Sequence, residues 1–269
     1  MEDDQQVLDA ERALEALTRI FERVQRFSDE MARSADGGGI APGSALSGDD
    51  KKSAYFQVSF YAWHLICTAN EHLHSLKLQM VDAKVLPRAP AFTVVRGAIE
   101  AAATARWMLM PNQRRERLRR RFALQYKEAG YSIDARKSLG ATTEAPSVKE
   151  KIMTIARARC GDQIRLTVPN HTAMLREVDE TLDEYIHPSI LGTWQLCSGF
   201  AHGYQWSGLA LFSREEVRQR TGGVIDARST NSEIAVYVAA HAAEFTMMAA
   251  MRRFQLLAHS TLLDDYCEG

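Results

Sequence analysis

The sequence predicts an all-α protein: a single helical-bundle domain of about seven to eight helices, with room for a small β-hairpin near residues 208–228. Three observations support this fold class. Residues 5–34 carry apolar side chains at steps of three and four with charges between them, which is typical of an amphipathic helix. Residues 53–85 and 231–266 are long apolar-rich stretches without internal proline. No internal repeat is visible, so a solenoid is not indicated.

The predicted domain covers residues 1–269 without a long linker. Residues 1–34 form its N-terminal amphipathic helix, and residues 35–52, rich in glycine, serine and proline, read as a flexible loop. Residues 53–269 form the core bundle. We therefore expect one domain with one loose connection near its N-terminus.

The remaining helices follow from apolar periodicity and from the breakers between them. Residues 91–110 are the most apolar segment and read as the central helix, which Pro111 and Asn112 end. Asn170 is a predicted N-cap, and Pro188 a stop signal. Further helices are expected over 113–139, 149–160, 171–187, 194–206 and 231–266, with GLALF at 208–212 as a short strand.

Composition limits the function classes. With 33 Lys+Arg against 34 Asp+Glu, the net charge is -1, so no global charge attracts nucleic acid or an anionic membrane. The sequence lacks a run of about 18 uncharged apolar residues, and its acidic start lacks the features of a signal peptide. The four cysteines have no CxxC spacing, which fits reduced thiols. We expect a cytoplasmic protein without membrane contact.

Six arginines occur between Arg114 and Arg121. On a helix they spread over several faces, with Glu116, Glu128 and Asp134 nearby to balance them. We therefore expect a solvated face, and a nucleic-acid patch is the alternative.

The segment Trp194–Trp206 (WQLCSGFAHGYQW) is the most unusual stretch. As a helix it places Ser198 and His202 on one side together with its two terminal indoles. Gly199 and Gly203, also four apart, would let a neighbouring helix approach closely. The segment therefore predicts either a close helix crossing with a core histidine or a functional histidine.

A second pair of polar residues lies inside the apolar segment 91–110. Arg96 and Glu100 are four apart and should bond to one another or to a polar partner across the core, because an unpaired buried charge is costly. We expect them to point toward the imidazole of His202. Arg96, Glu100, Ser198 and His202 are then the candidate catalytic residues.

The stretch VRGAIEAAATARWMLM at 95–110, followed later by WQLCSGFAHG at 194–203, resembles uncharacterised bacterial helical proteins of the HEPN superfamily. HEPN ribonucleases carry an arginine a few residues before a histidine on one helix; the arginine binds phosphate, and the histidine helps the 2′-hydroxyl to attack it. This sequence departs from that pattern, because no arginine shortly precedes His202. A metal-independent ribonuclease, with RNA as its partner, would need Arg96 from another helix.

A second alternative is a di-metal carboxylate site in a helical bundle. Such sites use two Glu-x-x-His pairs and two further glutamates. The sequence offers the pairs Glu71/His74 and Glu184/His187, with Glu100 and Glu244 as the further carboxylates.

The reading we favour is a helical binding or assembly protein without catalysis. The HEPN resemblance implies a toxin–antitoxin or phage-defence context for it. We expect a homo-oligomer or homodimer, with a protein partner or a small ligand held between Trp63, Trp194 and Trp206. P-loop, Rossmann, nucleophile-elbow and zincin motifs are absent from the sequence, so no cofactor is expected.

Overall fold

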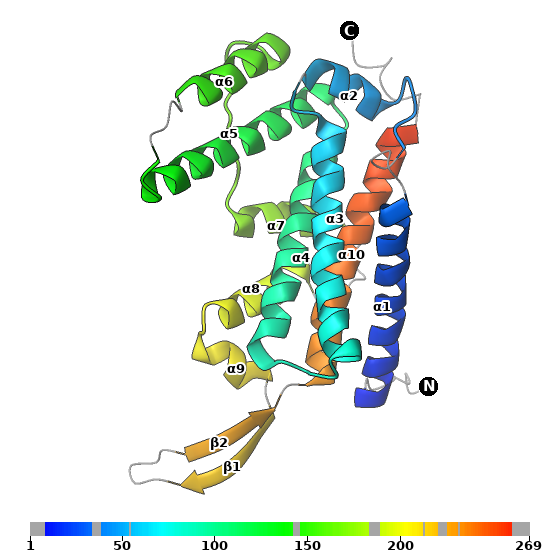
Figure 1. Ribbon diagram of the computed structural model, residues 1–269, viewed down its shortest axis with the longest axis vertical. Helices are drawn as coiled ribbons and strands as arrows, with labels where there is room; N and C mark the ends of the chain where they lie inside the picture. The colour runs from blue at the N-terminus through cyan, green and yellow to red at the C-terminus, as the bar shows by residue number, and fades with distance from the viewer. Residues whose placement is uncertain are drawn as a thin grey trace. The chain divides into compact units, whose positions relative to one another are not determined.

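The computed structural model describes residues 9–33, 39–53, 55–141, 146–182, 189–211, 213–219, 225–230 and 232–259. These ranges form ten α-helices, one π-helical turn and one two-stranded antiparallel sheet (Figure 1). The all-α prediction is therefore confirmed, and a hairpin is present in the predicted region.

The elements follow one another along the chain as α1 Ala10–Arg33, α2 Ala45–Ser53, α3 Val58–Lys77, η1 Leu78–Asp82, α4 Arg88–Leu109, α5 Arg114–Ser138, α6 Pro146–Cys160, α7 His171–Asp179, α8 Ile190–Ala201, α9 Gln205–Leu211, β1 Ser213–Gln219, β2 Ile225–Thr230 and α10 Glu233–His259. Here η1 is the π-helical turn that continues α3. The predicted cap of α7 forms, because the Asn170 side chain accepts a hydrogen bond from the amide of Ala173 at 2.9 Å.

The predicted flexible loop over 35–52 is wrong in its second half, where α2 forms. The hydroxyl of Ser44 accepts a hydrogen bond from the amide of Ser47 at the start of this helix. Asp49 of α2 is fully buried and bonds to the guanidinium of Arg117. The helix therefore depends on a distant charge, which local composition does not reveal.

The predicted continuous helix over 194–206 is also wrong. The chain leaves α8 at Ala201, passes through Gly203 with a positive φ of 70°, and restarts as α9 at Gln205. A glycine in the left-handed conformation is the usual end of a helix. The segment GLALF, expected as a strand, begins inside α9, and the strands start at Ser213.

The hairpin pairs β1 with β2 from Ser213 opposite Thr230 to Gln219 opposite Ile225, with a shift of register between Glu216 and Arg218. One extra residue on one strand is the mark of a β-bulge.

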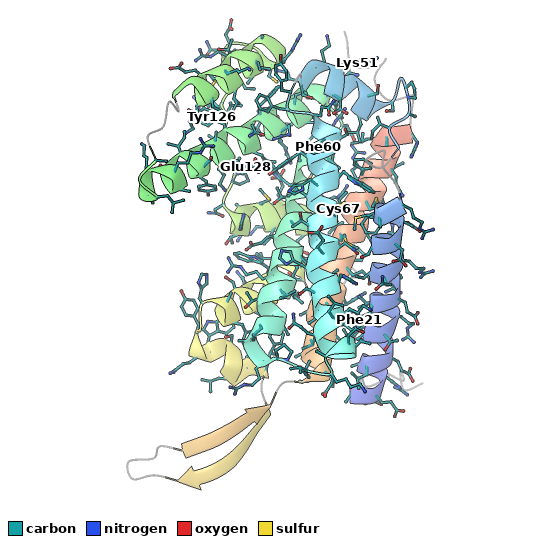
Figure 2. The ribbon with its side chains drawn as sticks, viewed as in Figure 1. Phe21, Lys51, Phe60, Cys67, Tyr126 and Glu128 are labelled. Carbon is teal, nitrogen blue, oxygen red and sulfur yellow. The ribbon has the colours of Figure 1, made fainter. Side chains whose placement is uncertain are left out.

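The described helices divide between two compact units, and α3, α4 and α10 contribute residues to both. The first unit comprises residues 1–33, 67–102 and 179–248. In it, α1 buries one stripe of side chains, which includes Phe21 (Figure 2). The guanidinium of Arg23 binds the carboxylate of Glu244 through two hydrogen bonds, at 2.5 and 2.8 Å. This pair, with a bond from Asn70 to Ser28, holds α1 against α10 and α3.

The second unit comprises residues 34–66, 103–178 and 249–269. Its centre is the ion pair between Arg117 and Asp49, whose side chains are 1% and 0% exposed. The Nε and Nη2 atoms of Arg117 donate to the two carboxylate oxygens at 2.6 and 3.0 Å. Its Nη1 donates to the carbonyl oxygens of Pro111 and Asn112. One guanidinium thus joins α2, α5 and the α4–α5 turn.

The prediction of a solvated arginine face is wrong for the inner part of the run. Arg117 is buried, and so is Arg121, whose guanidinium lies 4.0 Å from the centre of the Tyr61 ring. The Tyr61 hydroxyl in turn donates to the carboxylate of Glu128. These arginines hold helices together, and they do not form a patch for nucleic acid.

Helix α10 is long and apolar enough to cross a membrane by length and composition, and 61% of its apolar window is buried inside the protein. The core helix of a soluble protein meets the same criteria. Its buried residues include alanines 239, 240, 242, 243 and 250, and its mid-helix Glu244 is ion-paired.

Asp49→Leu should lower the free energy of unfolding by about 3 kcal/mol, because it leaves the buried guanidinium of Arg117 without its carboxylate. Arg117→Met should cost less, because Asp49 keeps an ion pair with Nε of Arg114 at 3.3 Å. Urea unfolding followed by circular dichroism measures this loss. The double variant D49L/R117M should lose less stability than Asp49→Leu, because it leaves no guanidinium of Arg117 to be buried without a carboxylate. Equal loss in all three would show that the charge pair is not what stabilises this unit.

Candidate functional site

The centre predicted from the sequence lies in the first unit. Arg96 and Glu100 occupy consecutive turns of α4, and the Nε of Arg96 donates to Oε1 of Glu100 at 2.8 Å. The indole Nε1 of Trp194, from α8, donates to the same oxygen at 2.8 Å. The Arg96 guanidinium lies 5.9 Å from the centre of the Trp194 ring. The structure thus brings together three of the predicted residues, which we call the α4–α8 cluster.

The α4–α8 cluster is only partly exposed, with side-chain exposures of 24% for Arg96 and 23% for Glu100. One carboxylate oxygen receives both donors, so the charge of Arg96 is compensated within the cluster. Such an arrangement joins two helices firmly. This arrangement suits a structural role better than phosphate binding, because a phosphate would have to compete with Glu100 for Arg96.

Two close contacts set the positions of the helices around the cluster. The rings of Phe92 on α4 and Phe200 on α8 stack with centres 4.2 Å apart. The imidazole of His72 on α3 lies against Gly97, where an added Cβ would be 2.7 Å from Nε2. Gly97 therefore leaves room for the His72 ring where α3 passes α4.

Cys197 lies on the inner side of α8 and is fully buried. Burial raises the pKa of its thiol to about 12, although the nearby charge of Arg96 acts in the opposite direction. The thiol is thus protonated at neutral pH and is a poor nucleophile.

Ser198 and His202 do not join the α4–α8 cluster, which corrects the predicted four-residue site. His202 is exposed at the end of α8, and Ser198 is half-buried. Within the described ranges, no hydrogen bond, ion pair or ring contact links either residue to Arg96 or Glu100. The His202 ring instead lies 5.6 Å from the ring of Tyr204, because the chain turns at Gly203.

The turn between α8 and α9 presents an apolar surface to solvent. Tyr204, Trp206 and Leu209 are 58%, 49% and 56% exposed, and His202 lies beside them. We call these four residues the α8–α9 surface. Segment 189–211 contains no Asp, Glu, Lys or Arg. Tyr204 and Leu209 were not predicted as site residues, although this uncharged run was visible in the sequence.

Trp63, expected beside Trp194 and Trp206, belongs to the second unit. Its indole packs on the ring of Phe254, with centres 5.6 Å apart. Trp63 therefore contributes to a core contact there.

The residues of the di-metal alternative are used in other ways where the structure describes them. His74 hydrogen-bonds the Gln25 side chain at 3.1 Å, and Glu244 binds Arg23. Glu184 and His187 lie outside the described residues. Across the described ranges, no group of three or more His, Cys, Asp or Glu side chains is arranged to hold a metal ion.

Comparison with known proteins gives no relative: no family model, no curated protein and no solved structure matches the chain.

Gly199 and Gly192 of α8 offer a matched test of this packing. A Cβ at Gly199 would lie 2.8 Å from Cζ2 of Trp206 and 2.9 Å from Cβ of buried Ser207, so Gly199→Ala should push α9 away. A Cβ at Gly192 meets nothing closer than 3.8 Å. We expect Gly199→Ala to lower stability by about 1–3 kcal/mol.

The control Gly192→Ala should be neutral or stabilise by up to about 1 kcal/mol, because alanine favours the helix. Chemical denaturation measures both variants, and Trp206 fluorescence reports the displacement of α9. Similar stabilities for the two variants would contradict the close α8–α9 contact.

Proposed function

We propose that this chain is a HEPN-like helical binding and assembly protein, and that it self-associates through the α8–α9 surface. The observation that carries the proposal is the exposure of Tyr204, Trp206 and Leu209 on a segment without charged side chains. The α4–α8 cluster beneath acts as the strut that holds α8 in place.

The composition of the α8–α9 surface supports this role. Protein interfaces are depleted of charged residues at their centres and enriched in tyrosine and tryptophan. In this chain 25% of all residues are charged, yet segment 189–211 has none. Trp206 and Leu209 lie three residues apart on α9 and so on the same side of that helix, and exposed apolar patches mark interaction sites in soluble proteins.

A second copy of the chain is the partner that fits best. An uncharged surface cannot select a partner by charge, and its complement must also be apolar and uncharged. The same surface on another copy meets that requirement, since a two-fold axis places each residue group opposite its own equivalent. A protein partner from a toxin–antitoxin or phage-defence system, as the HEPN resemblance implies, would compete for this surface.

The ribonuclease alternative has one observation in its favour, the exposure of His202 to solvent. A general base must reach the substrate, and this imidazole is accessible. However, the phosphate-binding partner it needs, Arg96, is bonded to Glu100. Assembly is therefore the better supported function.

The variant Leu209→Lys should raise the dissociation constant of the self-associated form at least tenfold, because it places a charge in an apolar interface. Sedimentation-velocity ultracentrifugation over a range of concentrations measures the effect. Leu139→Lys is the matched control. Leu139 is 86% exposed and lies in the connection between α5 and α6, outside segment 189–211. A monomeric wild type, or equal effects of both lysines, would overturn the proposal.

Purified wild-type protein should leave a labelled single-stranded RNA intact, with or without added divalent metal. His202→Ala should behave identically, since the contact found for the imidazole among the described residues is with the ring of Tyr204. Gel electrophoresis of the RNA after incubation is the measurement. Cleavage that disappears in His202→Ala would instead support the ribonuclease.

A further inference from the structure

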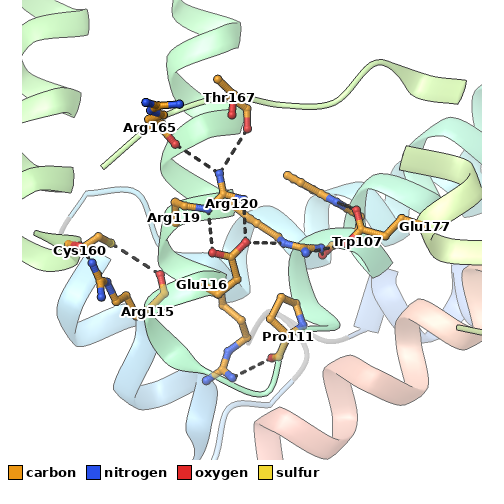
Figure 3. A network of polar contacts seen from close by, with 11 residues as sticks. Trp107, Pro111, Arg115, Glu116, Arg119, Arg120, Cys160, Arg165, Thr167 and Glu177 are labelled. Atoms are coloured by element: carbon orange, nitrogen blue, oxygen red, sulfur yellow. Dashed lines mark hydrogen bonds and ion pairs between the residues drawn. The ribbon is translucent and has the colours of Figure 1, made fainter. Parts of the chain in front are cut away.

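A polar cavity of about 500 Å³ lies in the second unit, where the first turns of α5 meet the segment that follows α6. Figure 3 shows the polar contacts of Glu116, Arg119 and Thr167, which line it. Its lining includes Arg115, Glu116, Arg119, Gln163, Arg165 and Thr167. The volume lies within the range of small-molecule sites. The function proposed above does not involve this cavity.

The wall of the cavity is built by Arg119. Its Nε and Nη2 each donate to a carboxylate oxygen of Glu116 at 2.7 Å. Its Nη1 donates to the carbonyl oxygens of Arg165 and Thr167 at 3.3 and 3.4 Å. This guanidinium therefore fixes the segment 165–167 against α5 and is itself fully occupied.

Glu116 is occupied as well. Besides Arg119, it accepts a hydrogen bond from Nε of Arg120 at 3.0 Å. The hydrogen bonds from Arg119 hold the pKa of Glu116 below its ordinary value, so the carboxylate is ionised. The negative charge of Glu116 is thus already paired with Arg119 and Arg120. It is therefore not available to neutralise Arg115 and Arg165.

Two arginines keep donors available. Arg115 uses its Nε for the carbonyl oxygen of Cys160 at 2.9 Å, which leaves its two terminal nitrogens. Arg165 contributes its backbone carbonyl to the wall, and its guanidinium has no hydrogen bond or ion pair with the described residues. The lining carries three arginines and one glutamate, and is therefore net positive.

We infer that this cavity binds the phosphate group of a small phosphate monoester. Arg115 and Arg165 both line the cavity with terminal nitrogens that make no hydrogen bond to the described residues, and arginine binds phosphate oxygens in a bidentate manner. The first turn of α5, which borders the cavity, adds a favourable dipole. Besides its charged residues, the lining contains two glutamines, Thr167 and Ile164 but no aromatic ring, so the rest of the ligand is mostly polar and does not include a stacked base.

Isothermal titration calorimetry at constant ionic strength tests the inference with three probes: inorganic phosphate, glycerol 3-phosphate and neutral glycerol. Both phosphates should bind and glycerol should not. Arg165→Ala should weaken glycerol 3-phosphate binding at least tenfold. This variant removes no side-chain hydrogen bond or ion pair among the described residues, so its thermal unfolding should match the wild type.

Arg157→Ala is the matched control, since Arg157 is exposed on α6 and does not line the cavity. It should bind glycerol 3-phosphate like the wild type. Absence of phosphate binding by the wild type, or equal weakening by both variants, would overturn the inference. So would exclusive binding to phosphatidic acid vesicles or to a 5′-phosphorylated RNA, because the site would then belong to a membrane or a nucleic acid.

Discussion

A buried arginine must form hydrogen bonds to a carboxylate or to carbonyl oxygens, because an unpaired buried charge is costly. This requirement determines much of the packing in both units. In the second unit, Arg117 is buried against Asp49 and the carbonyls of the α4–α5 turn. In the first unit, Arg23 reaches Glu244 and Arg96 reaches Glu100. Arg117 and Arg23 each join different helices, whereas the Arg96–Glu100 pair lies within α4 and is linked to α8 by the indole of Trp194.

The sequence predicted the helices well where a helix carries its own signals. The amphipathic stripe of α1, the Asn170 cap of α7 and the breakers after α4 all lie within a few residues of the element they define. Helix α2 escaped prediction because its partner, Arg117, lies 68 residues away in the chain. The end of α8 had a local signal in Gly203, which was read as a packing residue.

The candidate site was predicted only in part, for a related reason. The spacing of Arg96 and Glu100 correctly suggested a pair, since four residues bring two side chains to one side of a helix. The expected approach of His202 assumed that α8 continued through residue 206. Once the chain turns at Gly203, the imidazole faces solvent and meets Tyr204 instead.

The arginine run shows why charge patterns alone are ambiguous. Arg115, Arg117 and Arg121 belong to one run, yet Arg117 and Arg121 are buried among helices and Arg115 is exposed and lines a cavity. Sequence gives the number of cations. Which of them keep donors for a ligand depends on the carbonyl groups and carboxylates that folding brings within reach.

The placement of the uncharged residues on a single turn also bears on the size of the assembly. If the α8–α9 surface pairs with the same surface of a second copy about a two-fold axis, both surfaces are buried and neither can bind a third chain. Filament growth would need a second, different contact. Association through the proposed α8–α9 interface alone would therefore end at two chains.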